Sequence, residues 1–129
     1  MVQSAFQITF GVLLMKKSDL VEKNLFGICP FATTQQLLLG KWLIPILNEL
    51  NSGKKRFSEL QRVFGISQTT LSKQLKILEE EELIKRKIYP EVPPRVEYSL
   101  SELGQKFKPV LDSIEIFGEI YIDYLKNRK

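Results

Sequence analysis

A run of short hydroxyl and amide side chains stands next to lysines near the middle of the chain. If this stretch is helical, these side chains lie within its first turns. Short donors and acceptors there can reach the edges of bases in a nucleic-acid groove, and lysines can neutralise phosphates. The set comprises Ser67, Gln68, Thr69, Thr70, Ser72, Lys73 and Lys76.

Basic residues are concentrated around this run. Residues 54–78 hold six basic residues and one acid, and residues 83–96 hold four basic residues and one acid. These segments carry +5 and +3, whereas the whole chain carries only +4, so the remainder is net acidic. Such concentration is expected for phosphate contacts, although a solvated basic surface is the alternative. The cations proposed as contacts outside the run are Arg56, Lys85, Lys87 and Arg95.

The composition argues against several kinds of chemistry. The chain has no histidine and a single cysteine, Cys29, so it lacks the ligands of a structural zinc site and the base of a Ser-His-Asp or Cys-His pair. It also lacks a glycine loop that could cradle phosphates. We therefore expect no enzyme, no metal and no cofactor. A chain that cannot form an internal disulfide fits the cytoplasm.

The length of 129 residues fits one domain. Residues 1–14 differ from the rest, and Met15-Lys16-Lys17 resembles a protein start. We expect residues 1–14 to be an extension, disordered or not native, although an added strand or helix is an alternative. Residues 15–129 then form the domain. The apolar stretch Phe10–Met15 is too short to span a bilayer, so no membrane association is expected.

Two helices joined by a tight turn can position the polar run. Residues 58–61, Ser-Glu-Leu-Gln, fit a capping box that opens the first helix at Ser58. Gly65 supplies the turn, and Ser67 is a natural N-cap for the second helix. That helix buries leucines at spacings of four and three and exposes the polar run. This is the helix-turn-helix plan, and an ordinary amphipathic helix is the alternative.

Two strands should follow this helix. Residues 84–89 and 95–100 alternate apolar and polar side chains, and residues 90–94 form a proline-rich link that cannot be helical. The pattern predicts a hairpin, or wing, whose Lys85, Lys87 and Arg95 grip the DNA backbone. Arg86 has the opposite orientation and is expected to face the protein.

The C-terminal region predicts a long helix with too much apolar surface for one small domain. It begins near Ser101, and Gly104 and Pro109 predict a break near its start. Its apolar residues form more than one stripe, which indicates a subunit interface unless the monomer covers them all. The predicted interface residues are Phe107, Val110, Leu111, Ile114, Phe117, Tyr121 and Tyr124.

The expected fold is therefore mainly α with a small β-hairpin wing, a winged helix-turn-helix whose DNA-binding core spans about residues 41–100. An ordered set of short motifs between Cys29 and Leu125 resembles the HxlR-type family of bacterial winged-helix regulators. Pro45 and Phe117 depart from the family pattern without touching the DNA-facing residues. The motifs are Cys29-Pro30, Gly40-Lys41-Trp42, Arg56-Phe57 with Leu60, Gly65-Ile66-Ser67 with Leu71, Leu75 with Leu78-Glu79, and Tyr98 with Leu100-Ser101 and Gly104.

The resemblance implies a sequence-specific transcriptional regulator of double-stranded DNA. It implies a homodimer held by N- and C-terminal helices on a two-fold operator, with residues 67–76 in the major groove. Some relatives sense oxidants through the cysteine of the Cys-Pro motif, here Cys29. A redox switch, an unidentified small-molecule effector and a purely structural buried thiol all stay open. A winged helix used only for protein contacts and a binder of double-stranded RNA are the competing interpretations.

Overall fold

The computed structural model describes residues 25–128, and the chain divides into two compact units, residues 1–39 and 40–129. In the described part of the first unit, α3 spans Pro30–Leu37, with Cys29 as its N-cap and proline in its first turn. Proline is tolerated there because the first N–H groups of a helix lack intrahelical partners. The predictions for residues 1–14 and for a start at Met15 fall outside the described residues.

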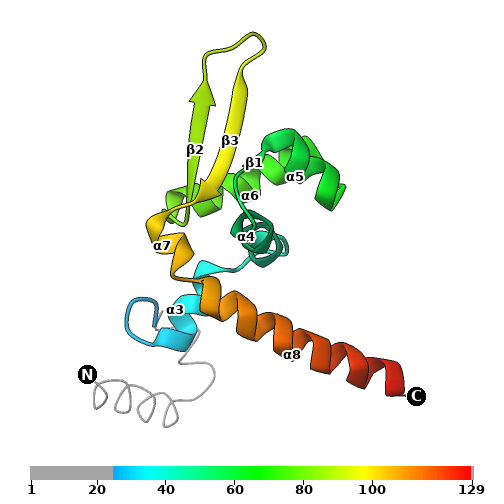
Figure 1. The fold of residues 1–129 in the computed structure, drawn as a ribbon. Helices are drawn as coiled ribbons and strands as arrows, with labels where there is room; N and C mark the ends of the chain where they lie inside the picture. The colour runs from blue at the N-terminus through cyan, green and yellow to red at the C-terminus, as the bar shows by residue number, and fades with distance from the viewer. Residues whose placement is uncertain (1–24, 129) are drawn as a thin grey trace. The chain divides into compact units, whose positions relative to one another are not determined.

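The second unit contains the predicted helices and hairpin (Figure 1). A three-stranded antiparallel sheet accompanies the helices, and the fold is a winged helix-turn-helix, as predicted. The elements are α4 (Leu43–Asn51), β1 (Lys55–Arg56), α5 (Phe57–Phe64), α6 (Gln68–Glu80), β2 (Ile84–Tyr89), β3 (Arg95–Leu100), α7 (Glu102–Gln105) and α8 (Lys108–Asn127).

Leucines and isoleucines from α4, α5 and α6 form the core of this unit. Each side chain in the set is at most 2% exposed, and burying one contributes about 1.5–3 kcal/mol. On α6 the buried positions recur at four and three, which leaves the opposite face to solvent. Trp42 packs against Phe64 with ring centroids 5.8 Å apart. The core residues of these helices are Leu43, Ile46, Leu47, Leu50, Leu60, Leu71, Leu75 and Leu78.

Helix α5 begins one residue before the predicted start. Arg56 is its N-cap, and the backbone N–H of Arg56 donates to the Glu59 carboxylate at 3.0 Å. The acceptor is therefore Glu59, and the expected box of Ser58 with Gln61 was wrong. Arginine has no side-chain acceptor, so only half of a capping box can form. The helix ends at Gly65, whose φ of 60° lies in the left-handed region that favours glycine.

The sheet has the order β1-β3-β2, so β3 is the central strand. The predicted strands have the bounds that the alternation indicated, and Lys85 pairs with Ser99 and Lys87 with Glu97. Strand β1 was not predicted, because two residues carry no detectable alternation. It pairs Arg56 with Glu97. Since Phe57 already belongs to α5, this pairing joins the wing directly to the helix-turn-helix.

The junction between the wing and the C-terminal helices is tightly packed. The Ser101 hydroxyl donates to the Glu82 carbonyl at 2.6 Å and accepts from the Gly104 N–H at 2.9 Å. The Ser101 N–H donates to the Leu83 carbonyl at 3.0 Å. A Cβ atom on Gly104 would overlap that same carbonyl oxygen. Only glycine therefore fits at position 104 without moving the backbone.

Helix α8 starts after the predicted break, which lies between α7 and α8. Leu111 is 4% exposed, and α8 contacts α4. Beyond this contact, Figure 1 shows α8 running away from α4 as a single straight helix. Of the predicted interface residues, Leu111 therefore belongs to the core of the second unit, and Phe107 is half-buried. The exposed ones are Val110, Ile114, Phe117, Tyr121 and Tyr124.

Candidate nucleic-acid interface

The start of α6 is fixed by hydroxyl contacts. Ser67 is the N-cap, and its oxygen accepts from the Thr70 N–H at 3.1 Å. The two hydroxyls also lie 2.9 Å apart in a hydrogen bond. The Ser67 and Thr70 side chains are therefore engaged in capping the N-terminus of the helix. Gln68 and Thr69 are exposed beside them and are better placed to reach bases.

One continuous face of α6 presents the remaining polar run. At 100° per residue these positions span an arc of about 140°. The buried leucines occupy a separate arc of about 60°. All five side chains are exposed, as predicted for the face of this helix that carries the polar run. The face consists of Gln68, Thr69, Ser72, Lys73 and Lys76.

An open groove of about 610 Å³ lies between α6, the start of α5 and the hairpin. It brings together four of the predicted contact residues, namely Arg56, Gln68, Ser72 and Arg95. The other predicted residues of α6 and the wing do not line it. The other residues that line the groove were not predicted to contact DNA. These are Phe57, Ser58, Arg86, Glu91, Val92, Pro93, Pro94, Val96 and Tyr98.

The hairpin has two chemically different faces. Arg86 faces the protein, as expected, and its Nε lies 3.4 Å from the Glu79 carboxylate of α6. It also lies directly opposite Tyr98 in the register of β2 and β3. Burial raises the pKa of Tyr98 above its ordinary value of 10.0, and the charge of Arg86 offsets part of this effect. The opposite face of the hairpin carries Lys85, Lys87 and Arg95.

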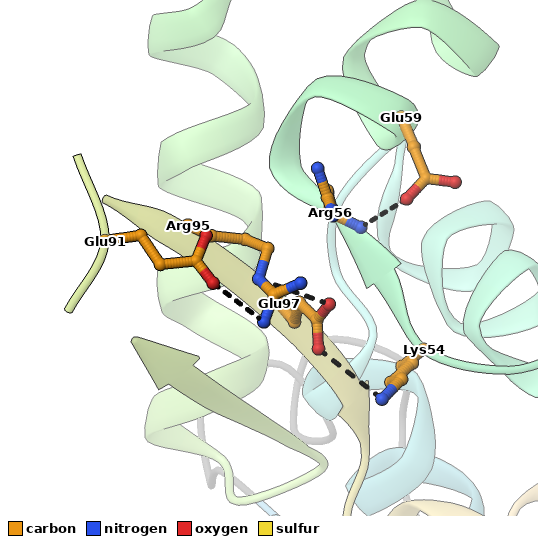
Figure 2. Close-up of polar contacts among 6 residues, drawn as sticks. All are labelled: Lys54, Arg56, Glu59, Glu91, Arg95 and Glu97. Carbon is orange, nitrogen blue, oxygen red and sulfur yellow. Dashed lines mark hydrogen bonds and ion pairs between the residues drawn. The ribbon is translucent and has the colours of Figure 1, made fainter. Parts of the chain in front are cut away.

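Arg95 is held by its neighbours in the wing. Its Nη2 lies 3.2 Å from the Glu91 carboxylate, and its Nε lies 3.8 Å from that of Glu97 (Figure 2). The guanidinium also stacks over the Tyr89 ring at 4.0 Å from the centroid. Sequence reasoning assigned Arg95 to the DNA backbone and missed this clamp. The i+2 spacing of Glu97 from Arg95 was the available signal, since such residues share a strand face.

A second cation approaches Glu97 from the turn before β1. The Lys54 Nζ lies 3.7 Å from Glu97 Oε1, and Figure 2 shows the chain of contacts from Lys54 through Glu97 to Arg95 and Glu91. Lys54 is mostly exposed, whereas the Glu97 side chain is only 12% exposed. Glu97 is therefore a mostly buried acid between two basic side chains.

Two other kinds of site are absent from residues 25–128. No group of three or more cysteine and acidic side chains within this range could hold a metal ion. Among the helices of the same range, none combines the length and the apolar character needed to cross a membrane.

A helix-turn-helix with an exposed polar second helix, followed by a basic hairpin, defines a DNA-binding module of the winged-helix class. The chain belongs to the HxlR-like helix-turn-helix family, whose model matches residues 37–126. It is a transcriptional regulator of the helix-turn-helix type. The relatives found by comparison are transcriptional regulators too, which is a non-enzymatic role.

Individual relatives are similar over most of their length. The HTH-type transcriptional regulator YdeP of Bacillus subtilis is 43% identical over 99 residues, which cover 76% of this chain and 77% of YdeP. A crystal structure of a MarR-family regulator from Porphyromonas gingivalis is 47% identical and covers 70% of this chain and 90% of its own, with a TM-score of 0.67. The structure of the redox regulator HypR in its reduced form is 36% identical, with a TM-score of 0.72. The match covers 77% of this chain and 99% of HypR.

Proposed function

We propose that the protein is a sequence-specific regulator that binds a two-fold operator as a homodimer, with the N-terminal half of α6 in the major groove. The observation that carries the proposal is the shared groove. Gln68 and Ser72 of α6 line the same groove as Arg56 and the wing residues. A duplex seated there would meet hydrogen-bonding side chains and cations at the same time.

The proposal divides the contacts into two kinds. Gln68 and Thr69 are exposed at the start of α6 and would contact base edges, because amide and hydroxyl groups match the donors and acceptors of the major groove. Lys73 would contact phosphate, because a flexible ammonium group neutralises charge without fixing sequence. A dimer would place two such helices about 34–36 Å apart on the operator.

The test compares the two kinds of variant on DNA fragments retained from a genomic library. Gln68→Ala should reduce the preference for the retained fragment over random duplex, since about 1–3 kcal/mol of discrimination is lost per base contact. Lys73→Ala should weaken binding to both duplexes and flatten the dependence of log K on log salt by about 1 per contact. Unchanged binding in both variants would remove α6 as the recognition helix.

The exposed apolar face of α8 supports the homodimer. Phe117 is 65% exposed, and its ring lies 6.1 Å from that of Tyr121, which in turn lies 5.6 Å from that of Tyr124. A large exposed aromatic patch on a helix is typical of an interface. Phe117→Ala should shift the protein from dimer to monomer in light scattering. Glu119→Ala is the control on the polar side of α8, and a dimer that survives Phe117→Ala unchanged would refute this interface.

The proposed signal is a ligand or an oxidant that favours one state of the dimer, because an effector acts only through its difference in affinity for the two states. The relative HypR is named as a redox regulator. In this chain the Cys29 thiol is only 2% exposed, which favours a packing role over a reactive one. Measuring the release of DNA caused by hydrogen peroxide, in the wild type and in Cys29→Ser, separates the two roles. If Cys29 is a sensor, the substitution abolishes the release.

The competing interpretations make different predictions for the same binding assay. A winged helix used only for protein contacts would retain no DNA and show no salt dependence. A binder of double-stranded RNA would be competed from DNA by an RNA duplex of equal length. Retention of DNA in the presence of such RNA supports the proposed regulator.

A further inference from the structure

Glu97 is surrounded by cations on the exposed face of the sheet. It lies on the central strand, directly opposite Arg56 of β1 and Lys87 of β2. Directly opposed residues of antiparallel strands project from the same face. Lys54 and Arg95 complete the surroundings at 3.7 and 3.8 Å. An acid at this position opposes phosphate binding by the cations that the proposed function requires.

Glu97 differs from the other acid of the wing in how firmly it is held. Glu91 belongs to the hairpin tip and its side chain is 53% exposed, so a phosphate can replace it beside Arg95. The Glu97 side chain is 12% exposed, and its strand is paired on both sides. The Glu97 Oε1 atom is buried without a hydrogen-bond partner among the described residues, and the nearby cations that offset the carboxylate charge are Lys54 and Arg95.

We propose that Glu97 limits the affinity of the wing for the DNA backbone. Its fixed charge cancels part of the charge of Arg95 and Lys54, so these cations release fewer counterions when a duplex binds. Glu97 is a positioning residue, since it acts through the cations and does not itself bind DNA. The inference rests on the proposed function, because it presupposes that the wing lies beside the duplex.

The size of the effect follows from counterion release. Glu97→Gln removes one negative charge, which raises the net charge by one per protomer and by two per dimer. At about 0.9 in slope per neutralised phosphate, the plot of log K against log salt should steepen by up to about 1.8 for the dimer. Taking equal affinities at 1 M salt, the same relation gives a gain of up to about 60-fold in affinity for random duplex at 0.1 M salt.

The experiment measures binding of a fluorescent random-sequence duplex to the full chain by anisotropy, from 0.05 to about 0.3 M salt, the range over which counterion release is pronounced. Glu97→Gln is expected to bind more tightly and with the steeper slope, and Glu97→Asp, which keeps the charge, to resemble the wild type. Glu80→Gln is the matched control, because it removes an equal charge from an exposed position at the end of α6.

The outcomes separate this inference from other roles of Glu97. A residue that only stabilises the hairpin would, when replaced by glutamine, weaken binding and lower the free energy of unfolding in urea. Such a result, or a slope equal to that of the wild type, overturns the inference while wild-type binding preserves the proposed function. An equal gain in Glu80→Gln overturns it as well, because the effect would then follow net charge alone. A wild type that binds no duplex removes both.

Discussion

The packing of Gly104 against Leu83 gives a quantitative prediction for Gly104→Ala. The added Cβ would overlap the Leu83 carbonyl oxygen and lie 3.1 Å from the Leu83 carbonyl carbon. These are backbone atoms, so no side-chain rotation can relieve the overlap. Either α7 or the start of the wing must move.

The expected cost combines three terms. Inserting a methyl group into a packed site costs about 1–3 kcal/mol. The displacement also weakens the hydrogen bond from the Gly104 N–H to Ser101, at a cost of about 1 kcal/mol. Alanine is a better helix former than glycine and returns about 0.5–1 kcal/mol. We expect a net loss of about 2 kcal/mol in the free energy of unfolding, or about 8 °C in Tm for a domain of this size.

Urea unfolding followed by far-UV circular dichroism measures this loss, at one fixed protein concentration because the proposed dimer would contribute to stability. Gly118→Ala is the matched control. It lies within α8 with no atom inside 4 Å of the added Cβ, so it should leave stability equal or raise it by up to about 1 kcal/mol. A Gly104→Ala protein within about 0.5 kcal/mol of the wild type, the usual range of surface changes, would refute the packing argument.

Three further predictions concern α6 and the sheet. Ser67→Ala should lower the free energy of unfolding by about 1 kcal/mol, because the Thr70 N–H loses its acceptor; Ser67→Asp should restore it in the same urea titration. Leu75→Ala should cost about 2–5 kcal/mol, since the side chain is 1% exposed, and a smaller loss by calorimetry would indicate a collapsible site. Burial raises the pKa of Tyr98, so the stability it contributes is present below pH 10 and is lost as pH rises through the folded-state pKa. The free energy of unfolding of Tyr98→Phe should therefore fall less between neutral and alkaline pH than that of the wild type, and parallel pH profiles would contradict this.

Local sequence signals predicted the helices and the hairpin well. Helix α6 follows from Ser67 as a cap and from leucines at spacings of three and four, and the two long strands follow from alternation. These features depend on neighbours within a few residues, so the sequence contains them directly. The start of α5 was misplaced because Ser58 and Glu59 are both plausible capping residues, and the backbone contact of Arg56 decided between them.

Most of the features that escaped prediction depend on residues far apart in the chain. Strand β1 exists because Arg56 pairs with Glu97, 41 positions later. The pairing of Lys54 with Glu97 has the same origin. The burial of Leu111 depends on where α8 meets α4, which the periodicity of α8 alone cannot reveal. Sequence patterns thus located the polar residues, while the tertiary fold determined which of them are engaged with one another.

The short pairing of β1 with β3 has a consequence for motion. Because β1 runs into α5 without an intervening loop, the amide protons of β3 and of the first turn of α5 should exchange with deuterium as one cooperative unit. The tip, residues 90–94, lies beyond the paired strands and should exchange earlier. Any change that tilts the wing must therefore also move the start of α5, because β1 joins the two.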